Sequence, residues 1–167
     1  RPTSHVDRVL DAAFSPSAAA HSRLVASWRR SAHKHGLDPA SKRDVARVTQ
    51  DCLKDRRASL DTFMTVAAPR LDALYALVGH SGCGVFLSDA KGIILDQRLR
   101  DADAPTFDHW GLCNGADWSE AQEGTNGIGT CLTEGRRLII TEVNISLPAH
   151  IHLSLVQEQS KKYLVVE

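Results

Sequence analysis

The chain has 167 residues, of which 43% are hydrophobic and 24% charged, enough for one globular domain with a helical appendage. Its 20 Lys and Arg balance its 20 Asp and Glu, which argues against direct contact with nucleic acid, because phosphate contacts need a surplus of cations. No apolar run approaches the roughly 20 residues that span a bilayer, and no signal peptide is evident, so we expect a cytoplasmic protein without membrane contact.

Two helices are expected near the N-terminus. Apolar residues recur at helical spacing between Val6 and Phe14. Ser22 suits the N-cap and Gly36 the C-terminal stop of a second helix over residues 22–35. Its apolar face holds Leu24, Val25, Trp28 and Ala32, and its basic face holds Arg23, Arg29, Arg30 and Lys34. A nucleic-acid stripe is one interpretation of the basic face, but a solvated face is favoured by the balanced net charge.

The longest helical run is expected over residues 53–79, after a short helix over 41–51. Its apolar stripe consists of Leu60, Phe63, Met64, Ala67, Leu71, Leu74, Tyr75 and Val78. Pro69 lies within this run and should end, kink or restart the helix. The stripe either packs on a sheet or joins two copies, and because a small sheet is too short to cover it wholly, we expect a homodimer. We divide the chain into an N-terminal helical region, 1–51, and a main domain, 52–167.

Strand signals dominate the second half of the chain. Residues 84–88 and 93–98, joined by the turn Asp89-Ala90-Lys91-Gly92, predict a β-hairpin, because Asp and Gly supply the chemistry of a tight turn. Three further strands are expected over 136–143, 151–156 and 163–166. The predicted fold class is therefore α/β, in the α+β sense, with an antiparallel sheet flanked by helices and preceded by a helical N-terminal region.

The stretch from Trp110 to Leu132 is the most unusual part of the sequence. It holds five of the eleven glycines, two of the three tryptophans and two of the four cysteines. An exposed pair of tryptophans would leave a large apolar area in water, at a cost of about 25 cal/mol per Å². We therefore expect this loop to fold back over the domain and to wall a cavity or an edge of the core.

Two motifs resemble a known family. Ser27-Trp28-Arg29-Arg30-Ser31, followed by Gly36-Leu37-Asp38-Pro39, resembles the N-terminal signature of the acetoin-catabolism-type regulators, bacterial activators that work with the sigma-54 form of RNA polymerase. Trp118-Ser119-Glu120, followed by the run from Gly124 to Leu132, is similar to the W-S-E-x-x-x-G-T-N-x-I-G-T-x-L motif of that family's GAF sensor domain. The resemblance covers about residues 22–141 and is lost beyond them.

The resemblance implies a GAF-like antiparallel sheet that binds a small molecule on one face, under a loop-and-helix lid. We expect a signal-sensing domain without catalytic turnover, whose output ATPase and DNA-binding domains belong to the full-length protein. The candidate ligand contacts are Trp110, Cys113, Trp118, Glu120, Thr125, Asn126 and Ile128. The alternative for Glu120, Thr125 and Asn126 is that they only cap the helix at 126–133 and stitch the loop. No particular ligand or cofactor is indicated.

Other activities have weaker support. The sequence contains no G-x-S-x-G, H-E-x-x-H or P-loop motif. Cys83, Cys113 and Cys131 leave open a thiol redox sensor or a protein like the GAF-type methionine sulfoxide reductases, although buried free cysteines are commoner. A dimerisation module with a vestigial pocket is a further alternative. His150 and His152 have the spacing of two metal ligands on a strand, but no third ligand is near them, so we expect no metal.

Overall fold

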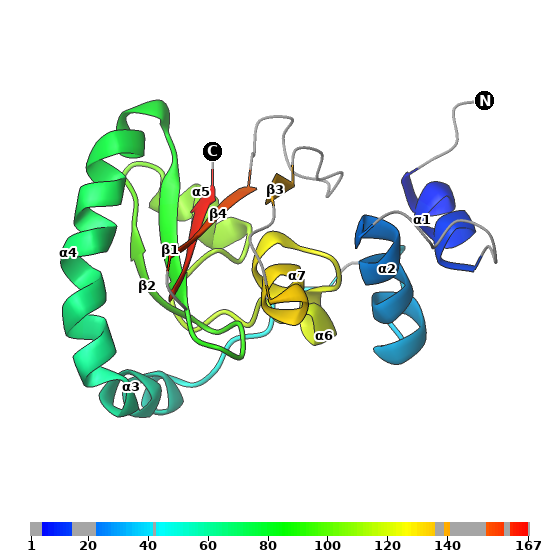
Figure 1. The fold of residues 1–167 in the computed structure, drawn as a ribbon, viewed down its shortest axis with the longest axis horizontal. Helices are drawn as coiled ribbons and strands as arrows, with labels where there is room; N and C mark the ends of the chain where they lie inside the picture. The colour runs from blue at the N-terminus through cyan, green and yellow to red at the C-terminus, as the bar shows by residue number, and fades with distance from the viewer. Residues whose placement is uncertain are drawn as a thin grey trace.

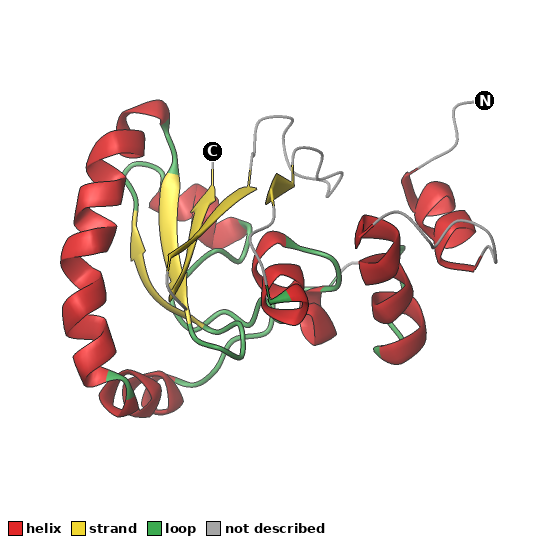
Figure 2. Cartoon of the chain, in the orientation of Figure 1, coloured by secondary structure: helices red, strands yellow, loops and turns green. Residues whose placement is uncertain are grey.

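The fold is described here from a computed structural model. It covers residues 5–14, 23–41, 43–135, 139–140, 153–158 and 161–166. A mixed layer arrangement is seen in Figure 1: the long helix α4 lies on one side of the sheet, the short helices α5 to α7 lie on the other, and α1 and α2 lie beyond α6 and α7. The α/β class expected from the sequence is confirmed, with helices flanking an antiparallel sheet (Figure 2).

The sheet has the strand order β2-β1-β5-β4-β3, and each neighbouring pair is antiparallel. Its strands are β1 (Gly84–Ser88), β2 (Ile94–Arg98), β3 (Ile139–Ile140), β4 (Leu153–Glu158) and β5 (Lys161–Val166). The predicted hairpin is confirmed, and Asp89 closes its turn by accepting the N–H groups of Lys91 at 2.8 Å and Ile93 at 3.0 Å. The last strand of the chain, β5, lies between β1 and β4, so the sheet is completed only by its C-terminal residues.

The run expected over 53–79 consists of two helices. Helix α3 (Gln50–Ser59) ends at Leu60, and α4 (Asp61–Val78) continues through Pro69 without a break. The proline removes one backbone N–H but does not end the helix, which packs on the sheet on both sides of it through Ala67 and Leu71. None of the described helices has the length and apolarity needed to cross a membrane.

Helix α4 covers one face of the sheet with the apolar stripe predicted from the sequence. Ala67 and Leu71 are buried against Val85 and Leu87 of β1. Around them, partly buried, lie Phe63, Met64, Leu74, Tyr75 and Val78. The sheet therefore buries the middle of the stripe but does not cover it wholly, and the homodimer stays a prediction. The large apolar side chains that α4 exposes are Val66 and Leu77, which lie outside the stripe.

The N-terminal helices are α1 (His5–Phe14) and α2 (Arg23–Arg29), and α2 continues as a π-helical turn over Arg30–Lys34. Together, α2 and the π-helical turn correspond to the helix expected over 22–35. Gly36 has φ +64°, a left-handed conformation that ends this helix as predicted.

The short helix expected over 41–51 is wrong. Residues 43–49 are not helical, and Arg47 forms an antiparallel bridge with Ala116 of the glycine-rich loop. Helix α3 begins only at Gln50, after Thr49, whose side chain accepts the N–H of Cys52. Backbone groups of 43–49 are satisfied by a distant segment, and this tertiary pairing outweighs the local helix propensity.

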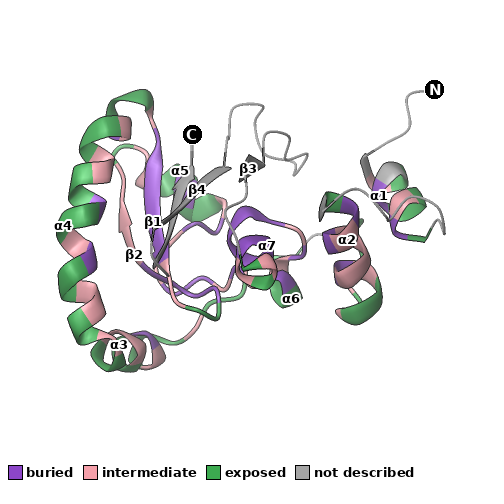
Figure 3. Cartoon of the chain, in the orientation of Figure 1, coloured by how far each residue is buried: buried purple, intermediate pink, exposed green. Residues whose placement is uncertain are grey.

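The second face of the sheet is covered by the glycine-rich loop. Within or next to this loop are α5 (Ala104–His109), α6 (Glu120–Glu123) and α7 (Gly127–Glu134). Its apolar cluster contains Phe86, Ile94, Phe107, Leu112, Ala116, Trp118, Ile128 and Cys131. Figure 3 shows buried backbone along β1 and along the loop that leads to α6, whereas the outer side of α4 is exposed. The loop therefore folds back over the domain and forms an edge of its core, as expected.

Candidate functional site

The glycine-rich loop is attached to the edge of the hairpin by backbone hydrogen bonds. Gly115 donates to the carbonyl of Ile94 at 2.8 Å, Ile94 donates to Ala116 at 2.9 Å, and Trp118 donates to Gly92 at 2.9 Å. The indole N–H of Trp118 donates to the carbonyl of Gly111 at 2.9 Å, so the buried ring keeps its polar atom satisfied. These bonds fix the loop before α6 as an extra edge of the sheet.

The extended segment 43–49 holds the loop from its other side. Val48 donates to the carbonyl of Gly115 at 2.9 Å, and Asp117 donates to the carbonyl of Ala46 at 2.8 Å. Gly111 has φ +75°, and a Cβ there would lie 2.6 Å from Cβ of Val45, so glycine is required for this close approach. The loop thus lies between the hairpin and a strap from the N-terminal region.

Helix α7 is capped by Asn126, a side chain that is 1% exposed. Its Oδ1 accepts the N–H groups of Ile128 at 2.9 Å and Gly129 at 2.8 Å, and its Nδ2 donates to the carbonyl of Gly124 at 2.9 Å. The backbone N–H of Asn126 donates to Oγ1 of Thr130 at 3.1 Å. The amide oxygen therefore has both of its acceptor positions filled within the loop.

The beginnings of α6 and α7 touch without a side chain between them. A Cβ on Gly129 would lie 2.7 Å from the carbonyl oxygen of Trp118 and nearer still to the backbone nitrogen of Glu120. Only glycine allows this spacing, since real Cβ atoms do not approach backbone so closely. Gly129 therefore sets the distance between the two helices.

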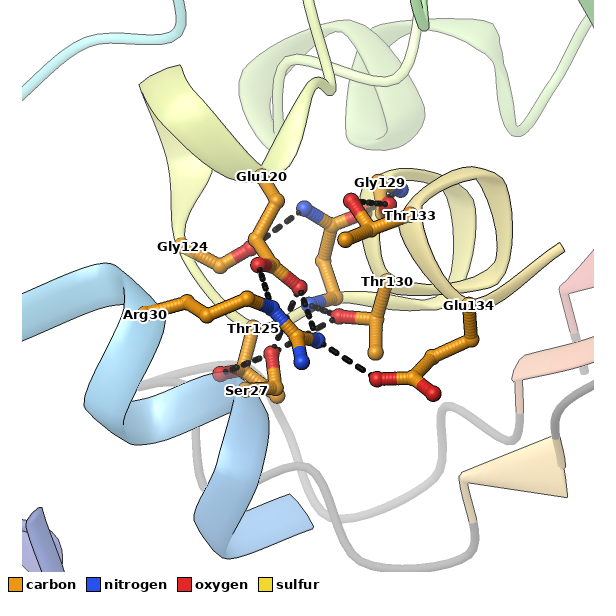
Figure 4. A network of polar contacts seen from close by, with 10 residues as sticks. Ser27, Arg30, Glu120, Gly124, Thr125, Gly129, Thr130, Thr133 and Glu134 are labelled. Carbon is orange, nitrogen blue, oxygen red and sulfur yellow. Dashed lines mark hydrogen bonds and ion pairs between the residues drawn. The ribbon is translucent and has the colours of Figure 1, made fainter. Parts of the chain in front are cut away.

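A buried polar network joins α2 to this corner of the domain (Figure 4). The hydroxyl of Ser27, which is fully buried, donates to Oε2 of Glu120 at 2.7 Å. It also lies 2.7 Å from Oγ1 of Thr125 and 3.1 Å from Oγ1 of Thr130. Because the single proton of Ser27 goes to the carboxylate, its oxygen can only accept from the threonine hydroxyls. The hydroxyl of Thr130 also hydrogen-bonds Glu120, so the carboxylate is held from two sides.

Arg30 adds two ion pairs to the network. Its Nε donates to Oε1 of Glu120 at 2.6 Å, its Nη2 donates to Oε2 of Glu120 at 3.0 Å, and Nη2 also lies 2.8 Å from Oε1 of Glu134. Glu134 is the last residue of α7, where a cation is also favoured by the helix dipole. The basic face of α2 was expected to be solvated; for Arg30 this is wrong, because 75% of its side chain is covered at the α6–α7 corner.

The network keeps the Arg30–Glu120 pair charged. Burial by itself raises the pKa of Glu120, but hydrogen bonds from Arg30 and Ser27, with the charge of Arg30, outweigh it, and the pKa is lowered. The hydrogen bond with Glu120 likewise raises the pKa of Arg30. A bidentate pair of this kind is both strong and dependent on geometry.

The seven predicted ligand residues fall into two groups. In or against the apolar cluster lie Trp110, Cys113, Trp118 and Ile128. In the polar network or at the cap of α7 lie Glu120, Thr125 and Asn126. Ser27, Arg30, Thr130 and Glu134 were not predicted as members of this network. The motif around Ser27 and Arg30 was a usable signal, because it and the G-T-N motif resemble signatures of the same family.

Trp110 and Cys113 lie at the partly exposed rim of the apolar cluster. The Trp110 ring packs edge-on against Phe107, with ring centroids 5.5 Å apart. Burial raises the pKa of the Cys113 thiol, the charge of Arg47 only partly opposes this, and the thiol stays protonated at neutral pH. The side-chain oxygen of the adjacent Asn114 is buried and has no hydrogen-bond partner in the described part of the chain.

None of the four cysteines, all within the described residues, forms a disulfide, and Cys83 and Cys131 are buried. Among the described residues no three His, Cys, Asp or Glu side chains are arranged to hold a metal ion. His150 and His152, the pair considered as metal ligands, lie outside the described residues.

Comparison with known proteins identifies the family. Residues 5–148 match the family model described as the MimR N-terminal domain. The chain belongs to this family. The match begins earlier than the residue 22 from which the sequence resemblance was noticed. It includes α1, the polar network and the whole glycine-rich loop.

Curated relatives of the chain are transcriptional regulators. It is 32% identical to the acetoin catabolism regulatory protein of Cupriavidus necator, over 92% of this chain and 24% of that protein. It is 33% identical to the propane 2-monooxygenase operon transcriptional activator MimR of Mycolicibacterium smegmatis, over 77% of this chain and 21% of that protein. The resemblance to the acetoin-catabolism-type regulators is thereby confirmed. The chain spans about a quarter of the length of these relatives.

A solved structure shares the fold. The chain matches a structure of the Escherichia coli DhaR(N)–DhaL complex with a TM-score of 0.73, over 86% of this chain and 51% of that one. The sequence identity is 11%, so the match shows only that the two proteins share a fold.

Proposed function

We propose that the chain is the signal-sensing domain of a bacterial transcriptional activator and binds a small molecule without catalytic turnover. The observation that carries this proposal is the unequal covering of the two sheet faces. Helix α4 closes one face with a continuous apolar contact, whereas the other is covered by a glycine-rich loop with a partly exposed aromatic and thiol rim. An apolar surface with a few polar groups at its rim is typical of small-molecule sites.

The ligand would lie against the loop-covered face, between Phe86 of β1 and the rim at Trp110 and Cys113. In this proposal Trp110, Cys113, Trp118 and Ile128 supply apolar contacts, and the free amide oxygen of Asn114 accepts a hydrogen bond. Glu120, Thr125 and Asn126 stay candidate contacts. Since Glu120 and Asn126 already have internal partners, they would contact a ligand only through a rearrangement of the network.

The regulator context extends the proposal beyond these 167 residues. Curated relatives about four times as long are transcriptional regulators, which supports output ATPase and DNA-binding domains elsewhere in the full protein, sigma-54 dependence, and a cytoplasmic site of action. In this view the sensor divides into an N-terminal helical region, 1–51, and a GAF-like domain, 52–167, and acts as a homodimer without touching DNA itself. Ligand binding would shift the population of two arrangements of the sheet and its covering helices.

A retained ligand tests the proposal most directly. Protein purified from its own host should carry a small molecule in native mass spectrometry, and unfolding should release it. Removing and restoring that molecule should change the indole emission, because Trp110 lies at the rim of the site. Trp110→Phe should weaken the change. A change of undiminished size in Trp110→Phe would place the ligand away from this rim.

Asn126→Ala separates capping from ligand contact. Loss of the cap alone should cost about 0.5–2 kcal/mol of stability and leave the affinity of the folded protein unchanged. Loss of a ligand hydrogen bond would instead lower affinity by about 1–3 kcal/mol. Thermal unfolding and ligand titration of the same variant give both numbers. A stability loss with unchanged affinity removes Asn126 from the ligand site.

The thiol-sensor alternative has less support. A redox-sensing cysteine needs an accessible thiolate, but Cys83 and Cys131 are buried and burial raises the pKa of Cys113. We therefore expect no disulfide between Cys113 and Cys131 under mild oxidation. Peptide mapping that found this bridge would restore the alternative.

A further inference from the structure

The N-terminal helices are attached to the rest of the protein by polar rather than apolar contacts. Val9 and Ala13 of α1 and Val25 of α2 are buried in the N-terminal helical pair. Within the described residues, neither apolar cluster of the sheet domain includes a residue of α1 or α2. Ser27 and the adjoining Arg30 join this helix to the domain by hydrogen bonds and ion pairs (Figure 4). Such an attachment buries little apolar area, so it depends on the geometry of its polar groups.

The backbone of the N-terminal helix changes at the residue that makes the ion pairs. Arg30 is the first residue of the π-helical turn, and its carbonyl accepts the N–H of His35 at 3.0 Å. A π-helical turn is rare, and such turns are found mostly at functional positions. Here it lies where the chain meets the loop, since Ser31 and Leu37 pack against Gly124.

The partners of Arg30 come from two separate helices. Glu120 is the first residue of α6, and Glu134 is the last residue of α7. The guanidinium reaches both only while these helices keep their present spacing, and that spacing is set by the close contact at Gly129. A displacement of α6 against α7 by about 1 Å would lengthen hydrogen bonds of this kind beyond their useful range.

We propose that α2 and the π-helical turn form a latch whose docking reports the spacing of α6 and α7. In the closed latch, Arg30 pairs with both Glu120 and Glu134. The hydroxyl of Ser27 then hydrogen-bonds those of Thr125 and Thr130. The latch opens when α6 and α7 move apart. The latch rests on the proposed function in one respect, because binding of the small molecule beneath the loop is what would change the distance between α6 and α7. The position of the N-terminal helices is then the signal passed on.

Hydrogen exchange measured by mass spectrometry tests the latch without any ligand. Glu120→Gln keeps the size of the side chain but removes its charge, and should raise exchange in residues 24–34 about tenfold or more. Gly129→Ala removes no side chain of the network, but its added Cβ pushes α6 away from α7. It should raise exchange in the same segment, whereas α4 and β1 should exchange as in the wild type.

Matched controls separate the latch from general destabilisation. Arg56→Gln breaks an ion pair of similar burial, between Arg56 and Asp89, that joins α3 to the hairpin turn. Gly84→Ala adds a Cβ 2.7 Å from the ring of Phe86, a milder clash inside the sheet because it meets a side chain and not backbone. Neither control should raise exchange selectively in residues 24–34.

Two results would overturn the latch. One is a folded Gly129→Ala protein whose residues 24–34 exchange as in the wild type, and the other is a rise spread evenly over α4 and β1 in Glu120→Gln. If Gly129→Ala does not fold, the reciprocal effect decides, because coupling acts in both directions. Ser27→Ala must then raise exchange at the capped N–H groups of Ile128 and Gly129, and unchanged exchange there overturns the proposal. The ligand proposal fails separately, by the absence of a retained molecule in native mass spectrometry.

Discussion

Helices α4 and α2 are docked on the same domain by opposite means. Helix α4 presents Ala67 and Leu71 to Val85 and Leu87, an apolar contact with no directional requirement. Helix α2 presents Ser27, followed by Arg30, to a carboxylate and two threonine hydroxyls, and each bond there needs a distance and an angle. The first contact stabilises the fold over small movements, whereas the second distinguishes one arrangement of the loop from another. A sensor needs both kinds of contact.

Leu71→Ala should give the largest loss, because it empties a fully buried position between α4 and the sheet. We expect the free energy of unfolding to fall by about 2–5 kcal/mol, with the whole domain affected. Urea unfolding followed by far-ultraviolet circular dichroism measures it. A charged residue at this position should unfold the protein rather than give a folded monomer. If Leu71→Ala lowered the free energy of unfolding no more than a substitution at an exposed position of α4, the apolar packing of this helix on the sheet would be contradicted.

Glu120→Ala should give a smaller and more local loss. It leaves Arg30 and Ser27 without their main partner, which costs about 1–3 kcal/mol, and solvent at the 25% exposed arginine reduces the penalty. Limited proteolysis should show earlier cleavage between α1 and α3 while the sheet domain resists. Arg56→Gln serves again as the control. Equal protection of the N-terminal helices in both variants would show that the polar contact does not hold them.

Acid should weaken the polar contact before the apolar one. The folded pKa of Glu120 is lowered from 4.5, so its stabilising contribution is fully present above that value and is lost as pH falls through the lower folded pKa. The effect should be smaller than removal of the side chain, because a protonated carboxyl keeps its packing. Glu123, whose pKa is raised by burial, acts in the opposite direction, so the measurement is the difference in stability between wild type and Glu120→Gln. A difference independent of pH would contradict the charged pair.

Leu77→Glu should have the smallest effect on stability, within about 0.5 kcal/mol, because the leucine is 70% exposed. It therefore tests the homodimer better than Leu71 and Tyr75, which contribute to the core side of α4. Sedimentation velocity should show the wild type as a dimer and Leu77→Glu shifted towards monomer. Thr65→Glu, on an exposed position of the same helix, is the control for added charge. If Leu77→Glu stays dimeric, the interface lies away from this surface.

Much of the candidate site could be predicted from the sequence. The network residues that were not predicted share one cause. The glycine-rich loop, its two buried or half-buried tryptophans and the cap at Asn126 follow from residue chemistry within a few positions. Ser27 and Arg30 were noticed as a motif, but Arg30 was assigned to a solvated helix face and Ser27 was given no role. Their partner Glu120 lies about 90 residues away, and helical periodicity says nothing about a partner at that distance.

The sequence by itself determined the elements whose hydrogen bonds close locally. The Asp89 turn, the helix stop at Gly36 and the capped α7 all join groups a few residues apart. The apolar stripe of α4 is likewise a repeat within one helix, although its partner on the sheet is not local. Only the tertiary structure decided that residues 43–49 are an extended strap and that Arg30 is an internal cation. In both cases the groups are satisfied by the same distant loop, and the free energy of those long-range bonds exceeds the small preferences that a local pattern can express.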